Sequence, residues 1–232
     1  MTCNHCPSES LSKKGKIGIK QRYQCKTCRK FQQDIYSYSR FDSKDDPQIK
    51  RLNAEGVGIR SMSRILGYSR GTIIRRILFL ASKVTKPIYS ENNQIYEVDE
   101  MWTFVGRNHP SNYSWITYAM NRRTRCIIDV SFGARSKSNL KKVIDSVKAQ
   151  NPKKIITDKL ITYPNLIKPI NHDTTRYANN RIERGNLTLR THLKRLFRKT
   201  ICFSKSQKML EACVLLYFDF QYWRLKMDRL YF

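Results

Sequence analysis

The sequence is poor in acidic residues and in glycine. Its 232 residues include 18 Asp and Glu against 45 Lys and Arg, and only nine residues are Gly. It contains no Gly-rich phosphate loop, no nucleophile elbow and no zincin helix. These absences argue against a P-loop nucleotidase, an α/β-hydrolase and a zincin protease.

Long apolar runs are also missing. The longest run, residues 212–218, is followed by Asp219 and is far shorter than the roughly 18 residues that span a bilayer. The N-terminus lacks the apolar segment of a signal peptide. Seven cysteines, an odd number, include two Cys-x-x-Cys pairs, which suits a reducing compartment better than a disulfide framework. We therefore expect a cytoplasmic protein with no membrane partner.

The excess of positive charge is large, with a formal net of +27. A hydrophobic share of 40% and an aromatic share of 11% indicate a folded protein and not a disordered basic tail. A folded domain with positive charge along most of its length most often binds a phosphate polymer. No single amphipathic basic helix concentrates the charge, so the pattern disfavours a membrane surface.

The first 40 residues carry two cysteine pairs, separated by 18 residues. Four thiolates at this spacing can converge on one tetrahedral Zn²⁺ and stabilise a segment with too little apolar content to fold unaided. His5 is an alternative ligand. We predict a zinc ribbon over residues 1–40, in which the metal is structural because protein fills all four positions. The predicted ligands are Cys3, Cys6, Cys25 and Cys28.

Residues 41–86 predict a helix-turn-helix domain that binds DNA. A helix to about residue 55 precedes helices over 59–66 and 70–81, which are separated by a Gly-containing turn with Ser69 as the N-cap of the last helix. The apolar face that they would share consists of Met62, Ile65, Leu66, Ile73, Ile77 and Leu80. In a helix-turn-helix the outward side of the second helix enters the major groove. Its outward residues here are Arg70, Thr72, Arg75 and Arg76. The alternative is a helical hairpin that only packs on the next domain.

Beyond a predicted linker over residues 87–93, the periodicity of the apolar residues changes. Alternating runs predict strands, and a run capped by Ser136 or Ser138 predicts a helix. Three strands, a helix and a fourth strand form an α/β layered pattern, so we assign residues 94–232 to one domain. It ends in a helix that packs on the sheet or forms a dimer interface. The predicted strands are 95–105, 114–120, 126–132 and 152–158, and the helices are 136–150, 177–190 and 204–225.

Carboxylates near the ends of neighbouring strands mark the expected ligand site of such a sheet. Asp99 and Asp158 hold these positions, and Glu183 on the predicted helix 177–190 would complete a cluster of three. Carboxylate oxygens suit Mg²⁺ or Mn²⁺, and two such ions can activate a water or a 3′-hydroxyl and stabilise the leaving oxygen. Glu97 and Glu100 flank Asp99 and remain alternatives on periodicity alone.

The helix 177–190 lies in a strongly basic run, residues 176–199. Glu183 and Arg190 are seven residues apart and therefore project from one side. The carboxylate is either paired with the surrounding arginines on a solvated helix face or holds a cation against a polyanion. We predict that Arg181 and Arg184 of this run contact DNA.

Several of these stretches together resemble the transposases of the insertion sequence 1 family, which belong to bacterial mobile elements. Residues 97–102 (Glu-Val-Asp-Glu-Met-Trp) and 181–190 (Arg-Ile-Glu-Arg-Gly-Asn-Leu-Thr-Leu-Arg) carry the resemblance most clearly. The other matching stretches, which keep the family's order, are residues 21–30, 56–60, 105–106, 157–158, 192–195 and 198–206. The resemblance implies an α/β RNase H-like catalytic domain, a mixed sheet flanked by helices. It also implies a DDE triad, carried here by Asp99, Asp158 and Glu183.

The resemblance also assigns roles around the triad. Arg190 takes the basic position seven residues after the Glu, which in these enzymes contacts DNA next to the scissile phosphate. His172, Arg176 and Tyr177 fall where the family keeps active-site neighbours, and we predict that Arg176 and Tyr177 contact DNA. Lys159 departs from the pattern, because relatives usually place Gly after the second Asp.

We therefore predict a DNA transposase of a bacterial insertion sequence. It would bind the terminal inverted repeats through the ribbon and the helix-turn-helix, cleave 3′ ends and join them to target DNA with Mg²⁺ or Mn²⁺. The expected partners are double-stranded DNA and further copies of the chain, as a homodimer or higher assembly on DNA in the bacterial nucleoid. The alternative is a sequence-specific DNA-binding repressor whose catalytic domain is inactive or vestigial.

Overall fold

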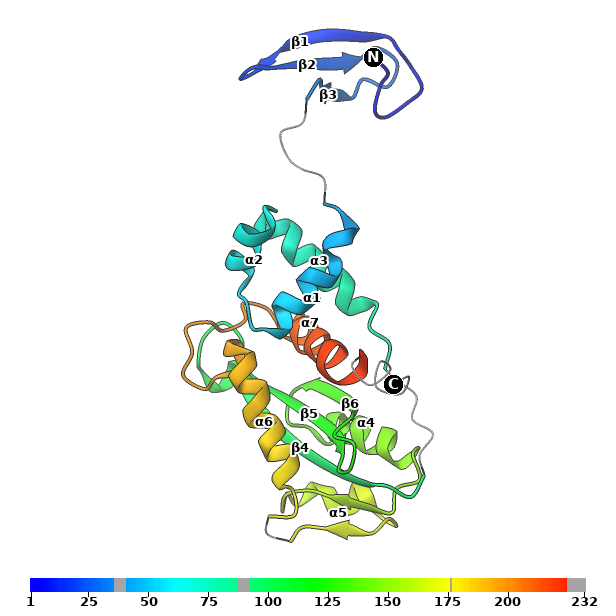
Figure 1. Cartoon of the computed structure of the whole chain (residues 1–232), viewed down its shortest axis with the longest axis vertical. Helices are drawn as coiled ribbons and strands as arrows, with labels where there is room; N and C mark the ends of the chain where they lie inside the picture. Colours follow the sequence, from blue (N-terminus) through cyan, green and yellow to red (C-terminus); the bar gives the residue numbers. More distant parts are fainter. Residues whose placement is uncertain (36–40, 87–91, 176, 225–232) are drawn as a thin grey trace. The chain divides into compact units, whose positions relative to one another are not determined.

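A computed structural model describes residues 1–35, 41–86, 92–175 and 177–224, without the side chains of residues 222–224. Contacts divide the chain into two compact units, Met1–Phe41 and Asp42–Phe232. Each unit is described by itself, with the elements labelled in Figure 1. Most of the predicted linker, residues 87–91, lies outside the described residues, and the predicted domain boundaries stay predictions. Among the described helices, none is long and apolar enough to cross a membrane.

The N-terminal unit is a three-stranded antiparallel sheet with almost no apolar core. Its strands lie in the order β1 (Leu11–Ile17), β2 (Lys20–Cys25) and β3 (Phe31–Gln33). Over residues 1–35 the buried apolar side chains are those of Cys3 and Cys25. So small a core does not stabilise a domain by burial alone, which is the expected situation for a fold held by a metal.

Three helices open the second unit, namely α1 (Asp46–Ala54), α2 (Ile59–Leu66) and α3 (Arg70–Ser82). The Ser69 side chain accepts a hydrogen bond from the backbone of Thr72 and so caps α3, as the sequence predicts. The predicted apolar face shared by α2 and α3 is wrong at one residue, Ile65, whose side chain is 56% exposed.

Two of these helices, α1 and α3, pack on α7 (Gln207–Phe218), the last helix of the α/β part, and α2 packs on α3. The Nζ atom of Lys50 in α1 lies 2.7 Å from a carboxylate oxygen of Asp219, and both side chains are buried. The side-chain amide of Asn53 donates to the carbonyl of Cys213 at 2.9 Å. A buried ion pair and a buried hydrogen bond therefore fix α1 against α7.

The α/β part is built on a five-stranded mixed sheet with the strand order β6-β5-β4-β7-β8. The first three strands along the chain are antiparallel, and β7 and β8 run parallel to β4. β8 and α5 are absent from the sequence predictions because a two-residue strand and a six-residue helix have no readable period. The elements are β4 (Ile95–Phe104), β5 (Tyr113–Asn121), β6 (Ile127–Gly133), α4 (Lys137–Lys148), β7 (Lys154–Ile156), α5 (Thr162–Ile167), β8 (His172–Asp173) and α6 (Asn180–His192). Short 3-10 turns cover Ser43–Asp45, Pro110–Asn112 and Lys194–Leu196, and a π-helical turn covers Asp219–Arg224.

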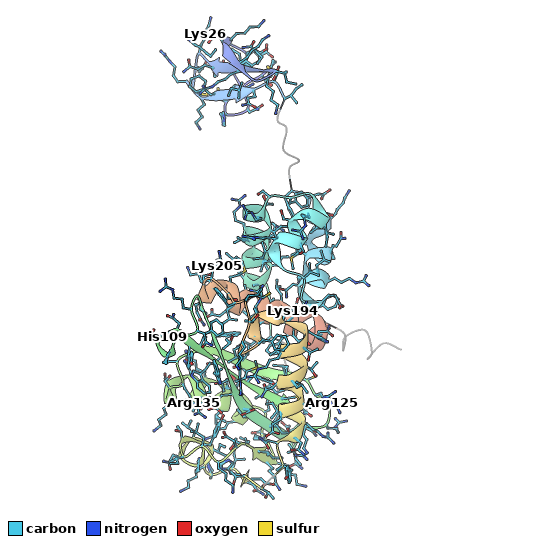
Figure 2. The ribbon with its side chains drawn as sticks, turned by 90° about the vertical axis from the view of Figure 1, so that its left-hand side faces the viewer. Lys26, His109, Arg125, Arg135, Lys194 and Lys205 are labelled. Atoms are coloured by element: carbon cyan, nitrogen blue, oxygen red, sulfur yellow. The ribbon has the colours of Figure 1, made fainter. Side chains whose placement is uncertain are left out.

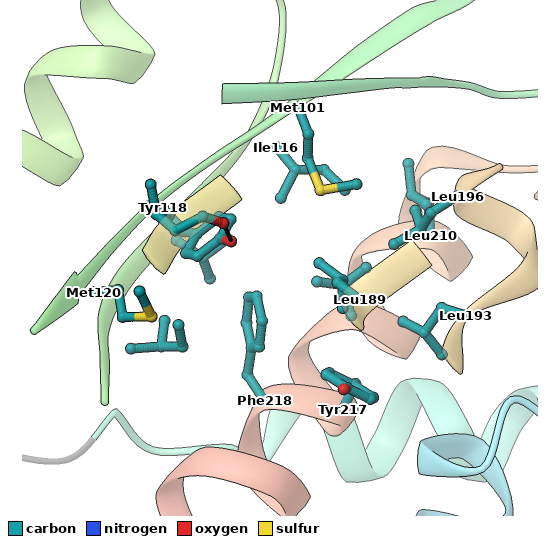
Figure 3. Packing of buried hydrophobic residues seen from close by; sticks show 14 of the residues in the cluster. Met101, Ile116, Tyr118, Met120, Leu189, Leu193, Leu196, Leu210, Tyr217 and Phe218 are labelled. Carbon is teal, nitrogen blue, oxygen red and sulfur yellow. Dashed lines mark hydrogen bonds between the residues drawn. The ribbon is translucent and has the colours of Figure 1, made fainter. Parts of the chain in front are cut away.

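Helices cover both faces of this sheet. On one face α4 and α5 pack over a buried cluster that includes Tyr96 and Val98 of β4. On the other face, Met101 of β4 faces Leu189 of α6 and Phe218 of α7 (Figure 3). Because successive side chains of β4 point to opposite faces of the sheet, this strand contributes to both hydrophobic cores. A mixed sheet flanked by helices fits an RNase H-like DDE domain, as predicted.

The turn between α1 and α2 touches the end of α6. Gly56 has φ +70°, and a Cβ atom there would lie 1.9 Å from the carbonyl oxygen of His192, the last residue of α6. Gly58, two residues on, has nothing within 4 Å of its Cβ position and is the N-cap of α2. Only glycine fits the first position, whereas the second is open.

Gly56→Ser should lower the free energy of unfolding by more than about 1 kcal/mol, because the side chain meets backbone in a left-handed conformation. Gly58→Ser is the matched control and should be neutral or stabilising by a few tenths of a kcal/mol, since Ser is a better N-cap than Gly. Urea unfolding of the two variants checks this. Equal stabilities would show that the turn does not close on α6.

Candidate active site

Helix α6 is held across β4 by two polar contacts. One carboxylate oxygen of Glu97 accepts a hydrogen bond from the backbone N–H of Ile182 at 2.8 Å, and the side-chain amide of Asn186 donates to Asp99 at 2.6 Å. Glu97 and Asp99 are two residues apart on a strand, which covers about 6.8 Å, and Ile182 and Asn186 are four apart on a helix, which covers about 6.0 Å. Because these two lengths are similar, both contacts can form at the same time. The side chain of Asn179 makes no capping hydrogen bond. Glu97 of β4 thus supplies the side-chain hydrogen bond at the start of α6.

Gly185 allows α6 to lie close to the sheet. A Cβ atom at this position would lie 2.9 Å from the hydroxyl oxygen of Tyr118, a buried residue of β5. The same hydroxyl donates to the carbonyl of Ile182 at 3.2 Å. Any larger residue would push the helix, and with it Glu183, away from β4.

Three carboxylates meet where the short strand β7 ends beside the middle of β4, so the predicted position of Asp99 near a strand end is wrong. Oxygens of Asp99, Glu100 and Asp158 lie within 4.8 Å of one another, the first two from β4 and the third just after β7. Burial, together with the charges of Glu100 and Asp158, raises the pKa of Asp99 to about 7, although the hydrogen bond from Asn186 acts in the opposite direction. Such mutual repulsion favours the binding of a cation.

Glu100 belongs to this cluster, whereas the sequence predicts it only as an alternative to Asp99. One of its oxygens accepts from the Tyr163 hydroxyl at 2.7 Å, and the other lies 3.2 Å from Nε of Arg135. Both oxygens are therefore already engaged by protein groups. Burial raises the pKa of Glu100, and the hydrogen bond from Tyr163 opposes this.

Glu183 is not a member of the described carboxylate cluster. It lies on the exposed side of α6 and lines a cavity of about 240 Å³ next to the cluster. The sequence-predicted pairing of Glu183 and Arg190 on one side of the helix agrees with this, because both line the cavity. Its other lining residues are Asp99, Glu100, Met101, Trp102, Asn186 and Arg198.

Two polar atoms of this cavity have no hydrogen-bond partner within the described part of the chain. They are Nε of Arg190 and Oδ1 of Asn186, both buried. Burial lowers the pKa of Arg190, and the charge of Arg198 acts in the same direction. Buried polar atoms without partners are rare in folded proteins, and here a donor and an acceptor face a cavity that also holds acids. Asn186 was missed by the sequence analysis, although it lies three residues after Glu183.

His172 lies beside the carboxylate cluster but is not part of it. Its Nε2 atom is 2.8 Å from the Thr157 hydroxyl, which is adjacent to Asp158. Burial lowers the pKa of His172, although the charge of Asp173 acts in the opposite direction, and this favours the neutral ring. Lys159 is exposed, and Oδ1 of Asp158 accepts from the backbone of Leu160 at 3.0 Å.

The predicted DNA contacts of α6 and its approach fall in different environments. Tyr177 is 63% exposed with φ +67°, and Arg184 is exposed. Arg181 is also exposed but donates to the carbonyl of Arg122. Arg176 lies outside the described residues.

On α3 the four predicted contacts divide in two. Arg70 and Arg75 are exposed, and the Thr72 hydroxyl lies 2.9 Å from the Ser69 hydroxyl. Arg76 instead makes a two-fold ion pair with Asp46 of α1. Its outward orientation is therefore wrong, because a partly buried carboxylate holds the guanidinium within the protein. Figure 2 shows the side chains of both units, with basic residues such as Lys26, Arg135 and Lys194 labelled.

The four cysteines of the first unit form one cluster. The Sγ atoms of Cys3 and Cys28, and those of Cys6 and Cys25, are each 3.6 Å apart. A tetrahedral zinc with bonds of about 2.3 Å requires sulfurs about 3.8 Å apart. The backbone N–H of Cys28 lowers the pKa of Cys25 to about 6, which favours the thiolate that a metal needs. The cluster is consistent with a zinc ribbon, and the alternative ligand His5 is exposed outside it.

Comparison with known proteins identifies relatives of this chain. The family model for the IS1 transposase matches residues 94–224. The InsB protein of insertion element iso-IS1n from Shigella dysenteriae is 36% identical over 120 residues, which cover 52% of this chain and 90% of that protein. The InsB protein of insertion element IS1 from Shigella flexneri is 32% identical over 128 residues, which cover 55% and 96%.

A solved structure, the cryo-EM structure of the simian T-cell lymphotropic virus intasome in complex with the PP2A regulatory subunit B56 gamma, contains a chain of low similarity. The TM-score is 0.38 at 13% identity, over 71% of this chain and 66% of that chain, which is too distant to inform the fold or function. The family match, in contrast, spans β4, the carboxylate cluster and α6. The chain therefore belongs to the IS1 transposase family.

Proposed function

We propose that this transposase binds the terminal inverted repeats of its element, cleaves the 3′ ends and joins them to target DNA with a divalent metal. The observation that carries the proposal is the arrangement of acids and bases around one cavity. Asp99 in the middle of β4 meets Asp158 just after β7, and Glu183 and Arg190 of α6 line the adjoining cavity. Carboxylates that repel one another favour the binding of a cation, and a partly buried guanidinium favours the binding of a phosphate.

Asp99, Asp158 and Glu183 would hold Mg²⁺ or Mn²⁺, since carboxylate oxygens are the ligands that these ions prefer. When bound, such ions polarise a phosphate and activate a hydroxyl or water. Glu100 is the competing third carboxylate, but Tyr163 and Arg135 already engage its oxygens. We assign Glu100 to holding the cluster in place.

The other cavity residues bind and orient. Arg190 would receive a non-bridging phosphate oxygen next to the scissile bond, with Nε still free to donate. Asn186 orients Asp99 through its amide and offers Oδ1 to a ligand. Neutral His172 supports the end of β7 through Thr157. Thus α6 supplies the ligand contacts and the strands supply the acids.

Glu183→Gln should lower the rate of 3′-end cleavage and strand joining by at least about a hundredfold, because a metal contact is worth several kcal/mol. Glu100→Gln, the matched control, should lose less than about tenfold, since Gln can still bond Tyr163. The assay uses the full chain, Mg²⁺ or Mn²⁺, and a duplex carrying the element's own ends. Binding to those ends should be unchanged in both variants.

Equal losses of binding and cleavage in Glu183→Gln would remove that residue from the triad. Tight binding by the unaltered chain with no products at any metal concentration would instead favour the repressor. Lys159→Gly would then be the first substitution to test for restored cleavage.

We further propose that α2 and α3 act as a helix-turn-helix, with α3 in the major groove. Arg70, Thr72 and Arg75 would face DNA, whereas Arg76 is committed to Asp46. A basic residue without a protein carboxylate partner can neutralise a phosphate or read a base edge. Arg181 and Arg184 of α6, together with Arg176 and Tyr177 before it in the sequence, would extend the contacts toward the cleavage site.

Arg75→Ala should weaken end binding by about 1–3 kcal/mol if it reads a base, or reduce the salt slope by about 1 if it binds a phosphate. Arg76→Ala should mainly lower the free energy of unfolding, because it leaves the Asp46 carboxylate unpaired. Fluorescence anisotropy at several salt concentrations and urea unfolding separate the two. Arg76→Ala with full stability and lost binding would contradict the assignment.

We propose that the cysteine cluster holds a structural Zn²⁺ and that this ribbon contributes to end binding. Cys25→Ser should reduce the zinc content from about one per chain and unfold residues 1–35. The control is Cys202→Ser, an exposed cysteine outside the cluster. Metal analysis and end-binding affinity are the measurements, and an unchanged zinc content in Cys25→Ser would overturn the proposal.

Joining two element ends requires a cavity at each end, so we propose that at least two copies assemble on double-stranded DNA. The place of action would be the nucleoid of a bacterial cytoplasm.

A further inference from the structure

Three aromatic residues form a strip on β4 and β5, which we call the aromatic platform: Trp102, Tyr113 and Trp115. Trp102 and Trp115 are direct cross-strand partners, and the centroids of the Trp102 and Tyr113 rings are 4.6 Å apart. Tyr113 pairs with Phe104, two residues from Trp102, so all three rings share one face of the sheet.

The platform lies beyond the apolar core of that face. The cluster beneath α4 and α5 includes Val98 and Ala119 but none of the platform residues. The three platform side chains are only half-buried, whereas their strand neighbours Met101, Ser114 and Ile116 are buried. Part of each aromatic side chain is thus open to solvent. This exposed aromatic surface does not contribute to the stability of the core.

Two arginines lie over the platform. The guanidinium carbon of Arg198 is 5.5 Å from the Trp102 ring centroid, and that of Arg135 is 4.5 Å from the Trp115 ring centroid. Arg135 also binds Glu100 of the carboxylate cluster at 3.2 Å. Aromatic faces alternating with guanidinium groups are the surface on which unpaired bases stack.

The platform adjoins the carboxylates. Trp102 and Arg198 line the same cavity as Asp99 and Glu183. Glu100 is two residues before Trp102 on the same strand and therefore on the same face. A nucleotide whose phosphate lies against Arg190 has its base within the reach of this platform, because both line one cavity of about 240 Å³.

We propose that Trp102 stacks an unpaired base of the element end, next to the scissile phosphate, after its base pair has opened. The proposal rests on the function proposed above and specifies that the cavity binds an element end in which one base is unpaired. Opening a pair costs a few kcal/mol, and stacking on an aromatic ring returns about 1–3 kcal/mol per base. Arg198 would add a contact to the base or its phosphate.

The test is a thermodynamic cycle that needs no cleavage. End duplexes carry a single mismatch, moved one position at a time across the region of the cleavage site. Their affinities are measured by anisotropy for the full chain with Glu183→Gln and no added Mg²⁺ or Mn²⁺. A mismatch removes the cost of opening, so one position should tighten binding by about five- to tenfold.

This gain should vanish in Trp102→Ala and persist in Trp102→Phe, which keeps a ring. Trp115→Ala is the matched control on the facing strand and should keep the gain, because Trp115 does not line the cavity. Loss of the gain in both alanine variants would mean that the sheet end had been disturbed, and would overturn the assignment to Trp102. A gain that is unchanged in Trp102→Ala would also overturn it.

Cleavage separates this proposal from the one on which it rests. With Mg²⁺, Trp102→Ala should cleave the paired end at least about fivefold more slowly and recover on the mismatched end. Products from the unaltered chain with no mismatch dependence would reject the platform and leave the transposase reaction intact. If a mismatch tightens binding but neither the unaltered chain nor any variant gives cleavage products, the proposed reaction is rejected and the stacking role of the platform is retained.

Discussion

The crossing of α6 over β4 is the contact on which the active site depends. Glu97 caps the helix from the strand, and Asp99 binds Asn186 one turn further along. The spacing of strand residues by two and helix residues by four brings both contacts into register. Because α6 also carries Glu183, this crossing sets how far that residue lies from the strand acids. Gly185 keeps the separation small by leaving room for the Tyr118 hydroxyl.

Three acids within four residues of β4 have three different roles, which their neighbours decide. Glu97 is buried with an Arg122 guanidinium 3.1 Å away and serves the helix. Asp99 faces the cavity with a pKa of about 7. Glu100 lines the same cavity, but its two oxygens are engaged by Tyr163 and Arg135. In a chain with so few acids, this concentration of carboxylates forms a cluster that could hold a metal ion.

The second unit ties its first three helices to its last. The Lys50–Asp219 ion pair is buried, and leaving either charge alone would be costly. The α1–α2 turn also meets the end of α6 at Gly56. The helix that we propose binds DNA, α3, is therefore connected through packed contacts to α6, the helix that lines the cavity.

The sequence by itself determined the features that depend on local spacing. Strand alternation gave β4 and its two faces, Ser69 and Ser136 gave the starts of α3 and α4, and the cysteine pairs gave the sulfur cluster. A spacing of seven residues placed Glu183 and Arg190 on one side of α6. Only the tertiary structure decided which groups meet across the sheet. Three such contacts join residues that are far apart in the sequence. The hydrogen bond from Ile182 to Glu97 spans 85 positions, that from Tyr163 to Glu100 spans 63, and the Arg76–Asp46 ion pair spans 30. No periodicity reports such contacts, because they depend on how elements pack and not on how each one repeats.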